Sequence, residues 1–280
     1  SSSMIPFDPL SPDFARDPYP VYAALRDEPG PHYFAGFDVW LLSRFADVSA
    51  AALNPKLVRS LEAFLPPEEI ARRKRAANWH DMPAHSRFVQ FSLLDSDGPV
   101  HDRLRRLVFA EFTAAAIARL RADTEALICG LLEVALAKGT IDFVEDFAAQ
   151  VPGRVIGRLL GAPDQDGARL RRWSEDIVRY FDLDRSDANK ALAETATAQF
   201  HDELRALAAA RRRAPRDDLI SRLAAAQTAG TLSQDEFIST AMLILMAGHG
   251  SSIDVMASGL HALLRFDGEQ ARLRAEPGLL

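Results

Sequence analysis

The stretch Ala247-Gly248-His249-Gly250-Ser251-Ser252 lies inside a long apolar segment that has the pattern of a helix. Each glycine in a helix interior lowers stability by roughly 1 kcal/mol relative to alanine. Two glycines next to two hydroxyl side chains therefore oppose the helix that surrounds them. A requirement other than helix stability is expected to explain their presence.

The segment around this stretch has a clear start and end. Ser233 and Glu236 have the spacing of a capping box, in which the two side chains satisfy backbone amides at a helix N-terminus. The sequence after them is apolar on nearly all sides until Asp267-Gly268 ends the pattern. We expect a helix of this length and character to run through a protein core. Its uninterrupted apolar run, residues 241–248, is too short to span a bilayer, so no membrane partner is predicted.

Composition and charge argue against several classes of protein. The 280 residues are 48% hydrophobic, enough for a sizeable core, and their formal net charge is −6. A nucleic-acid partner is not expected, since such proteins usually carry a basic excess. The single cysteine, Cys129, permits no intramolecular disulfide, favours a reducing, cytoplasmic location, and is predicted to be a small buried residue. We interpret Ser1-Ser2-Ser3 before Met4 as a cloning remnant and expect residues 1–280 to form a single domain.

The pattern along the chain is mainly α with one small β-sheet. Residues 5–18 are expected to be an irregular arm, and residues 61–92 a long loop of the kind that is often functional. A β-hairpin is predicted from two short strands, residues 32–34 and 39–42. Helices are predicted over residues 19–26, 45–53, 100–113, 115–138, 143–161, 165–183, 187–213, 217–229 and 233–265.

A candidate anion-binding pair lies in the helix predicted after Asp97. His101 and Arg105 are four residues apart, which places them on one helix face within reach of the same ligand. Imidazole and guanidinium groups suit a carboxylate or a phosphate. Arg103 and Arg106 are also present, so a solvated basic face is an equally good interpretation of the spacing alone.

The stretch 247–252 also has two interpretations. The hydroxyl of Ser251, one turn after Ala247, could support proton transfer at a ligand lying against a helix bulge opened by Gly248 and Gly250. Alternatively, the small residues let a second helix approach closely, and taken alone this is the better interpretation. No pair of histidines has the helical spacing of a metal site, so no metal ligand is predicted in this chain.

Taken in order, five segments resemble the soluble bacterial cytochromes P450. The resemblance covers almost the whole chain, through the family's I and J helices, and implies a mainly helical fold with haem as cofactor. The family's Glu-x-x-Arg helix and haem-thiolate cysteine loop are not found, so we expect the domain to be incomplete, and the helical context of Cys129 does not match that loop. The five segments are residues 17–26, 39–48, 97–106 with Phe112-Thr113, 216–221 and 247–252.

The resemblance implies roles for individual residues. His101 and Arg105 would bind the haem propionates, and Ala247 and Gly248 would line the distal haem face, where the helix widens to admit dioxygen. Residues 61–92 would form part of the roof over the substrate, and the joint between residues 165–183 and 187–213 its lid. The side chains expected to contact substrate are Phe91, Leu94, Leu243 and Met246.

Two catalytic positions depart from the family pattern. Ser251 stands at the position of the family's threonine, whose hydroxyl helps to deliver protons to dioxygen, and Gly250 stands where the family usually has an acid. The acid–alcohol pair is therefore incomplete, and serine lacks the restricted χ1 of a β-branched residue. We expect looser coupling of dioxygen use to product formation.

These resemblances predict a haem-dependent monooxygenase that inserts one oxygen atom from dioxygen into a small or medium apolar substrate. Electrons would come from a ferredoxin and its reductase. The alternative is a haem-free or truncated relative that acts as a binding or recruitment module. A third interpretation, an unrelated all-helical ligand-binding or regulatory protein, is weakened by the acidic charge and by the absence of a recognition-helix region.

Overall fold

The computed structural model describes residues 5–162 and 167–279, so the serines at positions 1–3 and residues 165–166 of one predicted helix lie outside it. Within these ranges the chain is mainly helical with one two-stranded sheet, which confirms the predicted fold class. The helices are α1 (Pro12–Arg16), α2 (Tyr19–Asp27), α3 (Phe45–Ala52), α4 (Pro67–Ala76), α5 (Pro83–Gln90), α6 (Gly98–Phe109), α7 (Ala114–Lys138), α8 (Val151–Leu160), α9 (Gly167–Arg179), α10 (Asp187–Arg213), α11 (Leu219–Thr228), α12 (Gln234–Arg265) and α13 (Asp267–Ala275).

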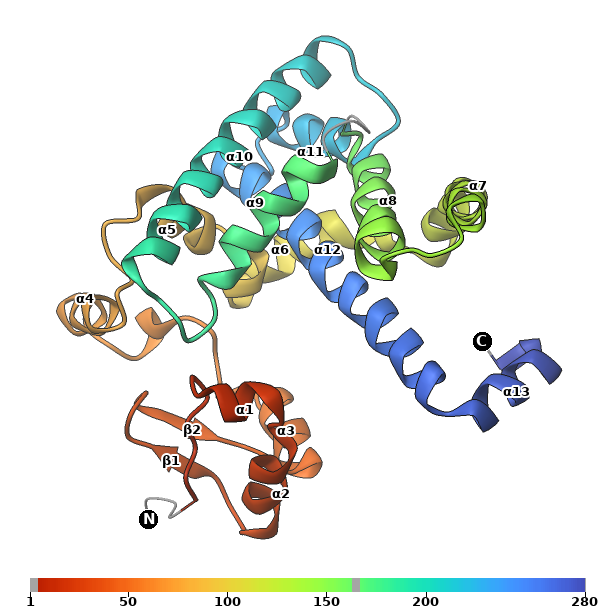
Figure 1. Ribbon diagram of the computed structural model, residues 1–280. Helices are drawn as coiled ribbons and strands as arrows, with labels where there is room; N and C mark the ends of the chain where they lie inside the picture. Colours follow the sequence, from red (N-terminus) through yellow and green to blue (C-terminus); the bar gives the residue numbers. More distant parts are fainter. Residues whose placement is uncertain (1–4, 163–166, 280) are drawn as a thin grey trace.

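The N-terminal part of the chain contains the predicted hairpin. Strands β1 (His32–Phe34) and β2 (Val39–Leu41) pair antiparallel, with Tyr33 opposite Trp40. The turn between them places Asp38 in a left-handed conformation, where its carboxylate accepts a hydrogen bond from the Tyr33 hydroxyl at 2.8 Å. Together with α1–α3 this sheet lies at one end of the molecule, apart from α7–α12 (Figure 1).

Two segments expected to be irregular contain helices. Residues 61–92 were expected to be a loop, but they include α4 and α5. The expected arm contains the short α1, whose first turn is capped by the Ser11 hydroxyl. All three helices carry proline in the first turn, where a missing N–H is tolerated. α4 is so rich in charge that its only buried residue is Ile70, which explains its weak hydrophobic periodicity.

Two further predictions are wrong. Residues 143–161 do not form one helix: a π-helical turn (Phe143–Phe147) and a 3₁₀ turn (Ala148–Gln150) precede α8, which carries Pro152 in its first turn. Cys129 is exposed and not buried. α7 packs mainly on α8 and on short flanking turns, and it lies at the edge of the molecule, so its outer side faces solvent (Figure 1).

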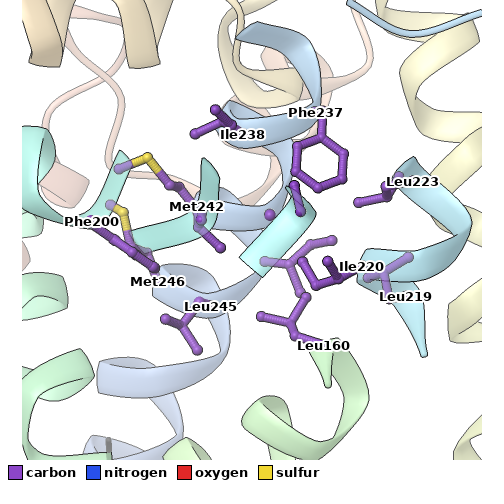
Figure 2. Packing of buried hydrophobic residues seen from close by; sticks show 14 of the residues in the cluster. Leu160, Phe200, Leu219, Ile220, Leu223, Phe237, Ile238, Met242, Leu245 and Met246 are labelled. Atoms are coloured by element: carbon purple, nitrogen blue, oxygen red, sulfur yellow. The ribbon is translucent and has the colours of Figure 1, made fainter. Parts of the chain in front are cut away.

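The core is built around the N-terminal half of α12. Its capping box is present as predicted: the Ser233 hydroxyl accepts from the Glu236 amide, and the Glu236 carboxylate accepts from the Ser233 amide. Phe237, Ile238 and Met242 are buried among side chains of α8, α10 and α11 (Figure 2). By length and composition α12 could cross a membrane, but 56% of its most apolar window is buried, as in the core helix of a soluble protein.

Candidate functional site

Helix α6 separates its basic residues onto different sides. Leu104 and Val108 are buried in the main core and orient the helix. Arg103 points to the start of α12, where its guanidinium donates two hydrogen bonds to the Glu236 carboxylate at 2.6 and 2.9 Å. This contact, more than any other, holds the pKa of Glu236 below its usual range. Arg103 is therefore a structural contact and not part of a solvated basic face shared with His101.

Four predicted site residues meet at one hollow of about 340 Å³. His101 and Arg105 reach it from one face of α6, as their spacing predicts. Leu243 reaches it from α12, and Leu94 from the turn before α6. The hollow thus combines two basic groups with two aliphatic side chains. Its full lining is Arg59, Leu93, Leu94, Ser96, Asp97, Gly98, His101, Arg105 and Leu243.

The two basic side chains of this hollow differ in their hydrogen-bond partners. The His101 ring nitrogen Nδ1 lies 3.1 Å from the Asp102 carboxylate. The Arg105 side chain makes no hydrogen bond or ion pair with any residue that the structure describes. Its guanidinium therefore keeps its five donors for a ligand or for water.

Sequence reasoning missed Arg59. Its side chain donates to the Asp95 carboxylate at 3.0 Å, and the backbone amides of Arg59 and Ser60 donate to the Asp97 carboxylate at 3.1 and 2.9 Å. Asp97 stands before α6 as expected, but its side chain binds these amides and does not cap the helix. The partners are 36–38 residues apart, so no local pattern could have revealed the contact.

Three residues spaced by four form a line along α12 beyond the hollow. Leu243 lines the hollow, and Ala247 and Ser251 follow it on the same face and are exposed. The Ser251 hydroxyl donates to the Ala247 carbonyl at 2.9 Å. The helix is continuous from Gln234 to Arg265, so the expected widening is not present in this structure.

The two glycines have different surroundings. A Cβ at Gly248 would lie 2.6 Å from Cδ1 of Ile156, so α8 approaches α12 closely at this point. For Gly248 the interpretation as a close helix contact is therefore supported. A Cβ at Gly250 would meet nothing within 4 Å. Gly248 and Ser251 also line a second, largely apolar hollow of about 520 Å³ between α7, α8 and α12.

Two predicted substrate contacts lie outside the first hollow. Met246 is only 6% exposed and packs in the main core near Phe200 (Figure 2). Phe91 is half-buried directly after α5. Neither side chain lines the hollow, so their contact with substrate stays a prediction.

The buried face of α12 carries a histidine inside the opening stretch. His249 is 1% exposed, and neither ring nitrogen has a hydrogen-bond partner within the described ranges. Gly153 of α8 makes room for the ring, because a Cβ there would lie 3.1 Å from it. Burial lowers the pKa of His249, and the positive charge of Arg171 lowers it further. Burial therefore favours the neutral form of the ring.

Comparisons with known proteins agree with this arrangement, although no family model matches the chain. The chain is 33% identical to vitamin D(3) 25-hydroxylase of Pseudonocardia autotrophica, covering 98% of this chain and 64% of that protein. It is also 33% identical to the cytochrome P450 monooxygenase PikC of Streptomyces venezuelae, covering 97% and 62%. The crystal structure of CalO2 superposes with a TM-score of 0.86 at 30% identity, covering 99% and 67%.

The match runs through nearly the whole chain in both sequence and structure. The chain spans a little under two thirds of the length of the two curated relatives. Both the similarity to PikC and the superposition on CalO2 extend through the helix that bears the 247–252 stretch. The chain therefore belongs to the cytochrome P450 family.

Proposed function

We propose that this chain belongs to a haem-dependent monooxygenase that inserts one oxygen atom from dioxygen into a small or medium apolar substrate. The observation that carries the proposal is the hollow in which His101 and Arg105 meet Leu94 and Leu243. The names of relatives, which include two hydroxylases, support the same type of reaction. The electrons would come from a ferredoxin and its reductase, and the enzyme would be cytoplasmic.

The residues of the hollow fit the acidic edge of haem. The porphyrin carries two propionates, and the hollow offers the unpartnered guanidinium of Arg105 beside the His101 imidazole. Charge-assisted hydrogen bonds from these groups would hold the propionates at the hollow. When bound, haem would supply the iron at which dioxygen is activated.

The side chains of this chain that would act in the reaction lie mainly along α12. Ala247 and Gly248 would line the distal side of the haem, and Ser251 would hold or pass a proton at its Oγ. In the structure that hydroxyl donates to the Ala247 carbonyl, so its lone pairs remain available to accept a hydrogen bond. Leu94, Leu243, Phe91 and Met246 would contact the apolar substrate.

Because position 250 is glycine and not an acid, the proposed function predicts how an acid placed there would change coupling. Space is available there, since a Cβ at Gly250 would meet nothing within 4 Å. We expect Gly250→Glu in the full-length enzyme to increase product formed per NAD(P)H consumed, because the carboxyl would supply protons near Ser251. No gain in coupling would show that water or a substrate group already performs this role.

Haem titration of this chain tests the assignment of the hollow. Arg105→Gln should weaken haem binding by about tenfold or more, because it removes a charged donor to a propionate. Arg106→Gln is the matched control: among the described residues, the exposed Arg106 side chain bonds the Asp102 carbonyl alone, and it does not line the hollow. Equal affinities of the two variants would contradict the assignment.

The full-length gene product tests the function itself. After reduction and exposure to carbon monoxide it should give the Soret shift of a thiolate-ligated haem. If no such band forms, the alternative of a haem-free binding or recruitment module is favoured.

A further inference from the structure

Helices α8 and α12 each carry a glycine that accommodates a side chain of the other helix. The two helices pack along each other, and Figure 1 shows α8 beside α12. A Cβ at Gly248 of α12 would lie 2.6 Å from Cδ1 of Ile156, and a Cβ at Gly153 of α8 would lie 3.1 Å from Cε1 of His249. Ile156 therefore packs onto the bare backbone of α12, and His249 packs onto that of α8. We call this pair of reciprocal contacts the interlock.

Two contacts in opposite directions fix how α12 is placed on α8. Gly153 and Ile156 are three residues apart, so they lie on one face of α8, and Gly248 and His249 are adjacent in α12. In each helix the residues on both sides of the glycine carry a Cβ. A shift by one residue moves a helix about 1.5 Å along its axis and turns its side chains by about 100°. Such a shift would bring Ile156 or His249 against a Cβ, so the interlock fixes both the rotation and the axial position of α12.

The His249 ring is held in place by packing and not by hydrogen bonds. It is 1% exposed, and neither ring nitrogen has a hydrogen-bond partner among residues 5–162 and 167–279. A neutral ring can occupy such a place with a modest loss of stability, whereas a protonated ring would be an unpaired buried charge. The interlock therefore requires the neutral form of His249.

Two charged groups of α9 act on His249. The positive charge of Arg171 lowers the pKa of His249 in the same direction as burial, which has the larger effect, and Glu175 acts in the opposite direction. The Arg171 guanidinium donates to Glu175 at 2.8 Å and to Glu145, in the π-helical turn, at 2.8 and 3.1 Å. Protonation of His249 would place a second positive charge near Arg171 and would push the ring away from Gly153.

The interlock adjoins the side chains that would act in the proposed reaction. Ser251 follows His249 by two residues, so it lies on the opposite side of α12, where it is exposed. Because α12 is one continuous helix, fixing the side that carries His249 also fixes the direction of the Ser251 side chain. Gly248 and Ile156 line the second hollow together with Ser251. The interlock therefore forms part of the wall of that hollow.

We propose that His249 is a positioning residue which, together with Ile156, fixes the rotation of α12 on α8 and thereby the direction of the Ser251 hydroxyl. The interlock itself needs only this chain. Its effect on the reaction rests on the proposed function, since that function assigns a proton to the Ser251 oxygen.

A double-mutant cycle on the chain without haem tests the contact between positions 153 and 249. Gly153→Ala should raise the unfolding constant about tenfold, because its Cβ meets the His249 ring. In a His249→Ala background the same change should lower the constant, since alanine favours a helix more than glycine does. His249→Asn provides a second background with a smaller cavity. Gly259→Ala, at an open position of α12, is the matched control and should lower the constant in every background. The same sign of effect for Gly153→Ala in all backgrounds would overturn the proposal.

A pH series separates the role of the neutral ring from packing in general. His249→Gln keeps a polar side chain of similar length that takes up no proton. Between pH 7 and pH 5 the ratio of wild-type to variant hydrogen-exchange rates should rise about tenfold in peptides from α8 and from residues 247–256. The reason is that a ring released from the interlock binds a proton near pH 6.5, whereas the packed ring does not. Peptides from α2 are the control and should keep a constant ratio. A constant ratio in α8 and α12 as well would overturn the proposal.

The full-length enzyme tests whether the interlock positions Ser251. Gly153→Ala should lower the product formed per NAD(P)H consumed about twofold or more, and adding His249→Asn should recover most of the loss, because the smaller side chain makes room for the new Cβ. Unchanged coupling in an active Gly153→Ala enzyme would overturn the positioning role. If the cycle on the haem-free chain gives the expected reversal but the full-length wild type forms no product, the proposed function is contradicted and the interlock is not.

Discussion

Gly248 and Gly250 are two residues apart in one helix, yet their surroundings give them different constraints. Neither has a positive φ, so both could accept alanine as far as the backbone is concerned. The neighbour at position 248 is the side chain of Ile156, whereas position 250 is open. The effect of each glycine on the stability of the folded chain therefore depends on whether another side chain lies against it.

Alanine substitutions should separate these constraints. Gly250→Ala should stabilise the chain by about 0.5–1 kcal/mol, because alanine loses less backbone freedom on folding. Gly259→Ala, at another open position of α12, should give a similar gain. Gly248→Ala should stabilise the chain less, or destabilise it, because the Ile156 side chain must move. Urea unfolding of the three variants measures this, and equal effects would contradict the close contact at Gly248.

His85 shows how burial controls a titratable residue. It is fully buried among the rings of Trp79, Phe88, Tyr180 and Phe181. Burial lowers its pKa from 6.5 to about 4, against a smaller opposite effect of the Ile177 backbone. The unfolded chain therefore binds a proton near pH 6.5, whereas the folded chain does so only near pH 4. The stability contributed by neutral His85 is complete above pH 6.5 and is lost as the pH falls toward 4.

His85→Phe should remove this dependence while keeping an aromatic ring in the cluster. The free energy of unfolding of the variant, minus that of the wild type, should rise by up to about 2 kcal/mol between pH 7 and pH 5. Other titrating groups, including His249 and the carboxylates, cancel in the difference. Urea unfolding at pH 7, 6 and 5 provides the measurement, and a constant difference would mean that His85 is protonated in the folded state.

At the scale of elements, one cluster joins the ends of three helices. Gly161 ends α8 in a left-handed conformation with φ +83°. The Asp218 carboxylate caps α11 through the Ser221 amide at 2.7 Å and accepts from Arg211 of α10 at 2.7 Å. Arg211 also donates to the Gly161 carbonyl. Burial alone would raise the pKa of Asp218, but the hydrogen bonds from Ser221 and Arg211 lower it overall.

Because of this cluster, replacing Gly161 should lower the free energy of unfolding more than replacing other glycines. A Cβ at Gly161 would lie 2.2 Å from the Asp218 carboxylate, in addition to the strain of a positive φ. Gly161→Ala should destabilise by about 2–4 kcal/mol. Gly230→Ala is the control, since Gly230 has φ +77° but open space, and it should cost about 1 kcal/mol. Thermal or urea unfolding compares them, and similar costs would show that Asp218 moves freely.

On the scale of the whole molecule, burial changes sharply along α12. Nine of the ten residues at 237–246 are buried, whereas residues 254–265 include no buried residue. In Figure 1 the C-terminal half of the helix extends beyond its neighbours toward α13. One continuous helix therefore has a core half and a half with few packing partners.

Hydrogen exchange of this chain should follow that division. Amides of residues 237–246 should exchange only through global unfolding, whereas those of residues 254–265 should exchange at least about a hundredfold faster through local opening. Peptide mass spectrometry resolves the two halves within one sample, so each serves as the control for the other. Equal protection would mean that the whole helix unfolds as one unit.

Much of the local structure could be predicted because its causes lie within a few residues. The capping box at Ser233 and Glu236 and the pairing of β1 with β2 depend on adjacent side chains and turns. The shared helix face of His101 and Arg105 follows from helix geometry alone. In contrast, α4 and α5 were missed because charge and proline obscure the hydrophobic pattern.

The helical class, the long core helix and the family could all be predicted from the sequence, because they depend on local pattern and on the order of segments. The folded chain was needed to show that Arg103 binds Glu236 while Arg105 faces the hollow, and that Gly248 meets Ile156 while Gly250 stays open. These outcomes depend on packing between helices that are distant in the chain. Such packing is set by the shape and volume of whole elements, which no short stretch of sequence contains.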